Sequence, residues 1–158
     1  MKFKTEIKWG LIFVLMTLAW LGLERLLGYH DEKINQHPVF SNLILVPAIA
    51  VYVFAFLDKR KTDYAGVMSY KQGFIFGLIM TAIVTLCVPI TQSIISYLIT
   101  PDYFASAIAY SVEQGEVSQE EAEQFFNLKS YIIQGMIATP IIGAATSALV
   151  AIFVRRKG

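Results

Sequence analysis

Few side chains in this sequence are of types that do chemistry inside an apolar protein, and the first of them is a glutamate. Glu24 is the only acidic residue inside an apolar run, and a carboxylate at membrane depth is a functional candidate by default. It lies about one helical turn from the end of its run and beside Arg25, so its side chain can extend to the lipid headgroups. We therefore expect Glu24 to anchor its helix at the membrane surface, with a buried proton or substrate contact as the alternative.

A short polar loop after this run carries two histidines and two carboxylates. These are His30, Asp31, Glu32 and His37, and such groups ligate zinc or copper when a fold brings them together. The histidine spacing matches no recognised ligand pattern, however, and a solvated interfacial loop is the simpler interpretation. We predict neither a metal site nor a cofactor, and keep a metal or ligand sensor built on this loop as an alternative.

Three amide side chains fall at similar depths in the other apolar runs, namely Asn42, Gln92 and Gln134. Amides buried in lipid are costly unless they meet each other or water. With Glu24 they form a candidate polar cluster in one half of the membrane. The alternative is ordinary hydrogen bonding between helices, worth only about 0.6 kcal/mol per pair.

Three prolines also fall at one level of the predicted helices. At about 1.5 Å per residue, Pro47, Pro89 and Pro140 lie roughly 12–15 Å below the same membrane surface. Each removes a backbone N–H and frees the carbonyl four residues earlier. Aligned helix breaks near the midplane are typical of transporters, whereas isolated prolines often only bend membrane helices.

The elements that must position these residues are predicted to be membrane-spanning helices. The chain has 158 residues, of which 56% are hydrophobic, against about 45–50% in soluble domains. Four apolar runs reach the roughly 20 residues that a span needs, at residues 9–27, 39–57, 73–99 and 131–154. We predict an all-α integral membrane protein forming one domain over residues 1–158. A single cysteine excludes a disulfide framework, and no dense basic patch indicates nucleic acid.

Basic residues determine the predicted orientation of the spans. With both termini in the cytoplasm, ten basic residues lie on the inner side. Only Arg25, Lys33 and Lys129 lie on the outer side. This asymmetry is the one that orients membrane helices. We therefore predict four spans with both ends inside.

The outer segment between spans three and four, residues 100–130, is predicted to form two short amphipathic helices. Thr100 and Pro101 have the types expected at an N-cap and first helical position. Ser118 and Glu121 form a capping box that begins the second helix. A similar box, Ser69 and Gln72, precedes span three on the inner side.

Small residues recur at every fourth position in spans three and four and indicate close helix packing. One stripe continues through Pro89 and Ser93, and the predicted packing residues of both stripes are Gly73, Gly77, Thr81, Thr85, Gly135, Thr139, Gly143, Ser147 and Ala151. Because the two spans are antiparallel, Gly73–Thr85 lies level with Gly143–Ala151. Contact between these parts is the simplest expectation, and self-association through one stripe is the alternative.

Two stretches, LDKRKTDYAGVMSYKQGFIFGLI and ITPDYFASAIAYS, together with the four-span layout, resemble a family of small bacterial membrane proteins known as domain of unknown function 4199. The matching residues are chiefly SYKQGF before span three and TPDYF after it. The family typically has asparagine before that proline, where this chain has Thr100. The resemblance implies the same topology and the bacterial cytoplasmic membrane, and it implies no activity.

No nucleophile elbow, phosphate loop or HExxH motif is present in the sequence, so we predict a protein that is not an enzyme. Our first hypothesis is a packed bundle that acts by associating with itself or with other membrane proteins, in contact with lipid and not with nucleic acid. The second is a transporter or channel for a small solute, ion or proton that uses the proline breaks and the polar cluster. The third is the sensor described above.

Overall fold

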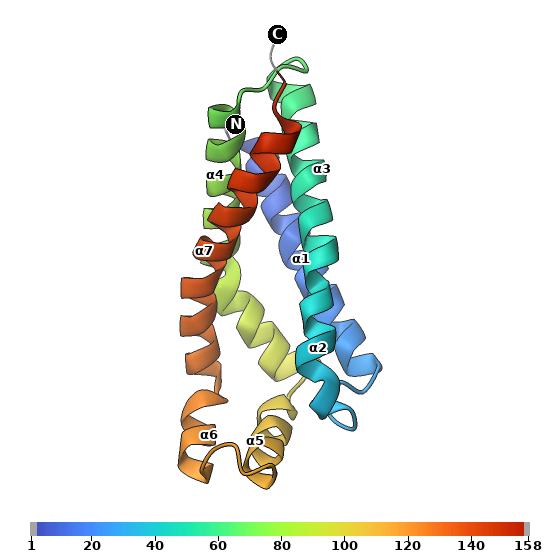
Figure 1. Cartoon of the computed structure of the whole chain (residues 1–158), viewed down its shortest axis with the longest axis vertical. Coiled ribbons are helices and arrows are strands. Elements are labelled where there is room, and N and C mark those ends of the chain that lie inside the picture. The colour runs from blue at the N-terminus through green and yellow to red at the C-terminus, as the bar shows by residue number, and fades with distance from the viewer. Residues whose placement is uncertain (1–2, 157–158) are drawn as a thin grey trace. The chain divides into compact units, whose positions relative to one another are not determined.

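A computed structural model describes residues 3–156, and every regular element in that range is helical. Figure 1 labels the helices. In chain order they are α1 (Lys4–Leu26), the 3₁₀ turn η1 (Ile34–Gln36), α2 (His37–Ser41), the 3₁₀ turn η2 (Asn42–Ile44), α3 (Leu45–Asp63), α4 (Tyr70–Ile94), the π-helical turn η3 (Ile95–Ile99), α5 (Tyr103–Glu113), α6 (Gln119–Phe125) and α7 (Leu128–Val154).

The four predicted spans are confirmed as helices long and apolar enough to cross a membrane. They cover Lys4–Leu26, Ile34–Asp63, Tyr70–Ile99 and Leu128–Val154. Large apolar side chains remain exposed along them, such as Phe54 at 59% and Leu86 at 73%, as expected for surfaces that face lipid rather than water. Several helices extend past the predicted apolar runs into polar residues. For example, α1 begins at Lys4 and α3 ends at Asp63.

Within the described residues the chain divides into two compact units, and the division crosses the spans. Unit 1 consists of residues 3–16, 45–87 and 136–156. Unit 2 consists of residues 17–44 and 88–135. Helices α1, α4 and α7 therefore contribute to both units, whereas α3 belongs to unit 1 alone. The single domain predicted from the sequence remains a prediction.

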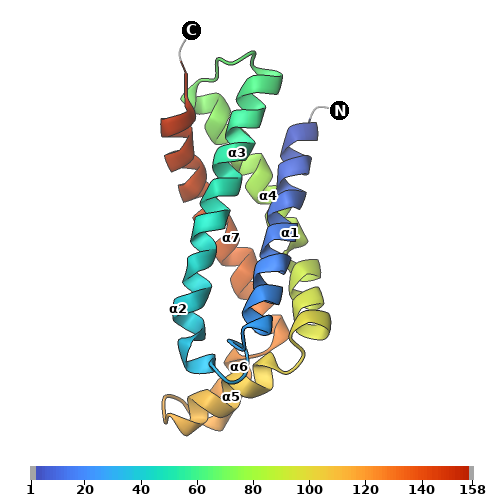
Figure 2. The same ribbon diagram turned by 90° about the vertical axis from the view of Figure 1, so that its right-hand side faces the viewer.

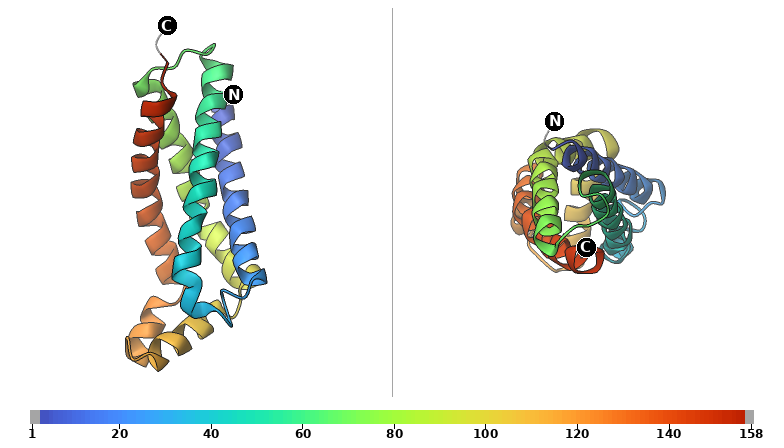
Figure 3. Two further views of the ribbon diagram at one scale, coloured as in Figure 1. Left: turned by 45° about the vertical axis from the view of Figure 1, so that its right-hand side comes forward. Right: turned by 90° about the horizontal axis from the view of Figure 1, so that it is seen from above.

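In unit 1, segments of α1, α3, α4 and α7 run alongside one another, as Figures 2 and 3 show. Their shared core contains Phe56, Met68, Phe76 and Met80, all nearly inaccessible to solvent. The Arg156 amide, just after α7, donates to the Met68 carbonyl in the connection from α3 to α4. The end of α7 and this connection therefore lie at the same end of unit 1. That connection begins α4 with the predicted Ser69–Gln72 capping box.

The small-residue stripes of α4 and α7 meet inside unit 1 in an antiparallel register. A Cβ atom on Gly77 would overlap the Ser147 side chain, and one on Gly143 would overlap Thr81. A Cβ on Gly73 would lie 3.4 Å from the Cβ of Ala151. The two helices therefore approach as closely as the missing side chains allow, which is how small residues stabilise helix pairs in membranes.

Charged residues at one end of unit 1 join α1 to α3. The Lys59 ammonium lies 2.8 Å from the Glu6 carboxylate and also pairs with Asp63. Asp58 accepts hydrogen bonds from Lys8 at 2.8 Å and from the Trp9 indole at 2.7 Å. Both Lys59 and Glu6 are buried, so these pairs explain why α3 stays helical beyond the end of its apolar run.

Unit 2 contains the short helices between the spans, and α5 packs against α6 in it (Figure 1). The predicted capping box of α6 is present: the Glu121 amide donates to the Ser118 hydroxyl and the Ser118 amide donates to the Glu121 carboxylate. The predicted cap of α5 is wrong. Thr100 instead ends the π-helical turn, where its amide donates to the Ile95 carbonyl, and Asp102 precedes the first residue of α5.

Candidate functional site

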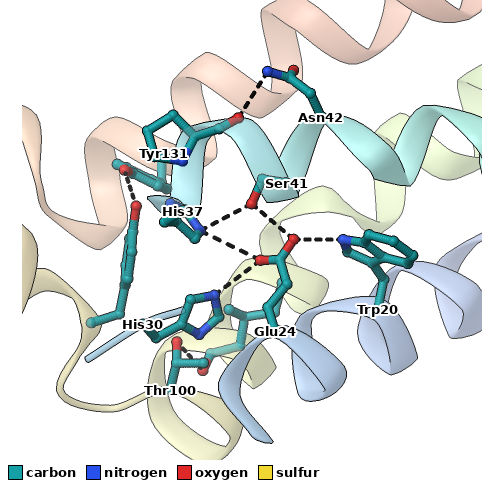
Figure 4. A network of polar contacts seen from close by, with 11 residues as sticks. Trp20, Glu24, His30, His37, Ser41, Asn42, Thr100 and Tyr131 are labelled. Carbon is teal, nitrogen blue, oxygen red and sulfur yellow. Dashed lines mark hydrogen bonds and ion pairs between the residues drawn. The ribbon is translucent and has the colours of Figure 1, made fainter. Parts of the chain in front are cut away.

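The most enclosed polar group of unit 2 is the Glu24 carboxylate, which is 0% exposed. Its Oε1 atom accepts from the Trp20 indole at 2.5 Å and from the Ser41 hydroxyl at 2.8 Å. Its Oε2 atom lies 3.0 Å from His30 Nε2 and 3.4 Å from His37 Nε2. Figure 4 shows these four side chains converging on the carboxylate. The expectation that Glu24 extends to the membrane surface is therefore wrong, because its charge is satisfied internally.

His30 reaches Glu24 because the chain reverses immediately after α1. Gly28 has φ +80°, a left-handed conformation that glycine adopts without steric cost and that commonly ends helices. The Gly28 amide donates to the Arg25 carbonyl, and the Tyr29 amide donates to the Glu24 carbonyl. The turn therefore returns His30 to the last turn of α1, where its ring is buried.

His37 and Ser41 approach from the first and last residues of α2. They are four residues apart on a helix, so both side chains occupy one face, and the Ser41 hydroxyl lies 3.0 Å from His37 Nε2. Trp20 and Glu24 have the same spacing on α1. Phe40 stacks on Trp20 with ring centroids 5.5 Å apart, which helps to hold α2 against α1.

A cavity of about 130 Å³ lies beside the two histidines. Its wall includes Leu21, His30, His37, Ser41, Gln92, Ile95, Ser96, Thr100, Tyr103, Phe104 and Tyr131. The Tyr103 ring contacts both imidazoles, with centroids 5.2 Å from His30 and 5.1 Å from His37. Its hydroxyl lies 3.2 Å from that of Tyr131. Burial raises the pKa of Tyr103, as does the Glu24 charge, so its phenol stays protonated at neutral pH.

The carboxylate and the two imidazoles have the arrangement of metal ligands. One ligand atom from each of Glu24, His30 and His37 lies within 4.8 Å of the other two. Ligand atoms at 2.0–2.1 Å from a tetrahedral zinc ion are about 3.3–3.4 Å apart. The two distances from Glu24 Oε2, 3.0 and 3.4 Å, differ little from that value, and the ligand atoms of the two histidines lie within 4.8 Å of each other.

The structure brings together a different ligand set from the one considered in the sequence. Asp31 and Glu32 are exposed and do not belong to the group formed by Glu24 and the two histidines. The sequence led us to predict no metal site, whereas in the structure Glu24, His30 and His37 lie together as a group that could hold an ion.

The candidate polar cluster is only partly assembled. Gln92 lines the cavity with both histidines. Asn42 is exposed and donates to the Pro38 carbonyl, 2.8 Å away. Gln134 is also exposed, and its amide donates to the Ser130 hydroxyl at 2.9 Å. Asn42 and Gln134 thus bond within their own helical segments rather than to Glu24.

Two of the three prolines do not end their helices. Pro89 lies inside α4 and Pro140 inside α7, and both helices continue beyond them. Pro47 lies in the first turn of α3, directly after η2, where its missing N–H costs little. The irregular backbone in this region is η3, whose residues Ile95 and Ser96 line the cavity. Such π-helical turns are frequent at functional sites.

Comparison with known protein families assigns the chain. The family described as "Protein of unknown function (DUF4199)" matches residues 8–156. The chain belongs to this family. The resemblance noted in the sequence is thus confirmed over nearly the whole DUF4199 chain. No curated protein and no solved structure matched it.

Proposed function

We propose that this DUF4199 protein is a non-enzymatic membrane protein that binds a divalent transition-metal ion, zinc by preference. Glu24, His30 and His37 are the proposed ligands. The observation that carries the proposal is the convergence of their ligand atoms within 4.8 Å. This proposal retains His30 and His37 from the hypothesis of a metal sensor. In place of the loop carboxylates of Asp31 and Glu32 it uses the carboxylate of Glu24 on α1.

The chemistry of the group favours zinc or a neighbouring first-row ion. Two imidazoles and one carboxylate suit these ions, whereas magnesium and calcium prefer oxygen ligands alone. Metal ligands are normally oriented by hydrogen bonds from a second layer of residues. Trp20 and Ser41 supply such bonds to Glu24 Oε1, which leaves Oε2 directed at the two histidines.

The distribution of charge supports the orientation predicted from the sequence, in which the connections between α1 and α3 and between α4 and α7 lie outside the cell. The described residues of unit 1 include eight basic and three acidic side chains, whereas unit 2 has three basic and nine acidic ones. By the positive-inside rule, both termini and the connection between α3 and α4 belong on the cytoplasmic side of the bacterial inner membrane. The excess of acidic residues in unit 2 attracts cations from the outer solution.

Association through the small-residue stripes is not part of this proposal. Gly77 and Gly143 already contact Ser147 and Thr81 within the same chain, so these parts of the stripes are occupied. The exposed apolar side chains of the spans support contact with lipid. Transport is not proposed either, because Asn42 and Gln134 do not join the cluster.

Metal binding is tested on protein purified in detergent through a tag that contains no histidine. After chelator treatment and dialysis against zinc, we expect about one zinc ion per chain. Losing a residue that hydrogen-bonds to a metal ligand typically weakens metal binding about 10- to 100-fold. Losing a ligand itself should weaken zinc binding more than this, in each of the variants His37→Ala, His30→Ala and Glu24→Gln. Trp20→Phe removes the hydrogen bond to Glu24 and reduces the ring that stacks on Phe40, and it should weaken binding about 10- to 100-fold.

The matched controls are Asp31→Asn and Glu32→Gln, since both residues are exposed acids near His30. They should retain zinc like the unaltered protein. Circular dichroism shows whether each variant is folded, and His37→Ala is the safest variant because its ring is 17% exposed. Wild-type protein without zinc, or a folded His30→Ala/His37→Ala variant with undiminished zinc affinity, would refute the proposal.

The orientation is tested separately with single cysteines in a Cys87→Ser background. Glu116→Cys and Lys61→Cys both place the thiol at an exposed position. In intact cells a membrane-impermeant maleimide should label the first and not the second. Labelling of Lys61→Cys alone would invert the proposed orientation.

A further inference from the structure

The proposed metal site is incomplete within the protein. Among the described residues, only Glu24, His30 and His37 form a group of three metal-binding side chains. Zinc takes at least four ligands, and sites with three protein ligands keep an open position for water or another molecule. Three such ligands leave the fourth position of a zinc ion open to a molecule from outside the chain.

The cavity beside the histidines has the place and size for such a ligand. Both His30 and His37 belong to its wall, so it adjoins the metal ligands directly. Its volume is about 130 Å³, well above the roughly 10–15 Å³ that one water molecule needs. A molecule of a few heavy atoms therefore fits beside the histidines.

Charge indicates what kind of small molecule is preferred. A divalent ion bound by one carboxylate and two neutral imidazoles carries one net positive charge. Glu24 and His30 are both buried, and an uncompensated charge is costly in such surroundings. A monoanion as the fourth ligand cancels this charge. Three residues of the cavity wall, Gln92, Ser96 and Tyr103, have side chains of types that can donate hydrogen bonds.

We propose that the cavity receives a small monoanion of carboxylate size, which completes the coordination of the metal. This inference rests on the metal site proposed above and names the class of molecule that the site recognises. Because Ser96 lies on the π-helical turn η3, that irregular backbone forms part of the proposed anion site.

The test uses cobalt-loaded protein, because the visible spectrum of Co²⁺ changes when its ligands change. Acetate and azide serve as the probe anions, and the cobalt content of every sample is measured. We expect a saturable spectral change with each anion. Ser96→Leu fills the cavity and should weaken the anion response at least about tenfold per bound cobalt. Ser93→Leu is the control on the preceding turn, because Ser93 bonds to the Pro89 carbonyl and is not part of the wall.

The outcomes separate the two proposals. Cobalt that binds through the histidines but gives no saturable response to acetate or azide overturns the anion site and leaves the metal site standing. An equal response in Ser96→Leu and Ser93→Leu also overturns the anion site. If no cobalt or zinc binds to the folded protein, both proposals fail.

Discussion

Adding one methyl group at Gly77 tests whether α4 and α7 pack as closely as the structure indicates. The new Cβ of Gly77→Ala would overlap the Ser147 side chain and lie 2.8 Å from Phe56 Cζ. Overpacking of this kind costs about 1–3 kcal/mol, which lowers the folding equilibrium constant roughly 5- to 150-fold. Replacing glycine with alanine also stabilises a helix by up to about 1 kcal/mol. The cost of overpacking is therefore measured against a control, a glycine-to-alanine change that has this helix-propensity gain and no overlap.

Gly22→Ala is that control, because nothing lies within 4 Å of its added Cβ. Gly73→Ala is an intermediate case, since its nearest neighbours are 3.3–3.4 Å away and include the flexible end of Met68. Unfolding in mixed detergent micelles, followed by circular dichroism, should rank Gly77→Ala well below Gly73→Ala and Gly22→Ala in stability. Adding Ser147→Gly should recover part of the loss, with a coupling of about 0.5–3 kcal/mol. Equal stability of Gly77→Ala and Gly22→Ala would refute the close packing.

Three further changes test other contacts. Lys59→Met leaves the buried Glu6 without its cation and should lower the free energy of unfolding by about 3–5 kcal/mol. Most of this loss should be recovered in Lys59→Met/Glu6→Gln, and an unchanged stability of Lys59→Met contradicts the pairing. The Ser118 hydrogen bonds hold the pKa of Glu121 below its usual value, so the stability that Glu121 gives α6 is complete above about pH 4.3 and is lost as the pH falls through the lowered value. Amide exchange in α6 should show this pH dependence, and the Glu121→Gln variant should not. Tyr52→Phe removes a buried hydrogen bond to Thr81 and should cost about 0.5–1.5 kcal/mol in the micelle assay, whereas no measurable cost would contradict that bond.

The helix pair of unit 1 illustrates what could be predicted from the sequence. Small residues four apart identify the faces of α4 and α7 that approach each other, and antiparallel direction determines which ends are level. The observed contacts of Gly77 with Ser147 and of Gly143 with Thr81 follow from these two facts. Close backbone approach depends on residue size, which the sequence states directly.

Helix ends were predicted less well, because apolar composition indicates where lipid begins and not where a helix stops. The run that ends near Leu57 continues as helix to Asp63. Its polar end is stabilised by Lys8 and Glu6 on α1, partners about 50 residues away in the chain. The start of α5 was misplaced for a related reason, since the Thr100 amide and hydroxyl both donate back to the Ile95 carbonyl and Asp102 is the residue that precedes α5.

The metal-ligand group was missed because its members were assessed by proximity in the chain. Asp31 and Glu32 are adjacent to His30 but are exposed, whereas Glu24 is reached only through the left-handed turn at Gly28.

A signal for the correct group was nevertheless present in the residue spacing. Trp20 and Glu24 are four apart before the turn, and His37 and Ser41 are four apart after it. Each pair therefore presents two polar groups on one helical face. One helix carries a carboxylate and an indole donor, and the next carries a histidine and a hydroxyl. When the two faces are buried together, these groups can satisfy each other's hydrogen bonds. Helices that share a short turn are neighbours in space, so the two faces can meet across the turn. Pairing such faces, rather than counting ligands along a loop, leads from the sequence to Glu24 and His37, and His30 lies in the turn that joins the two helices.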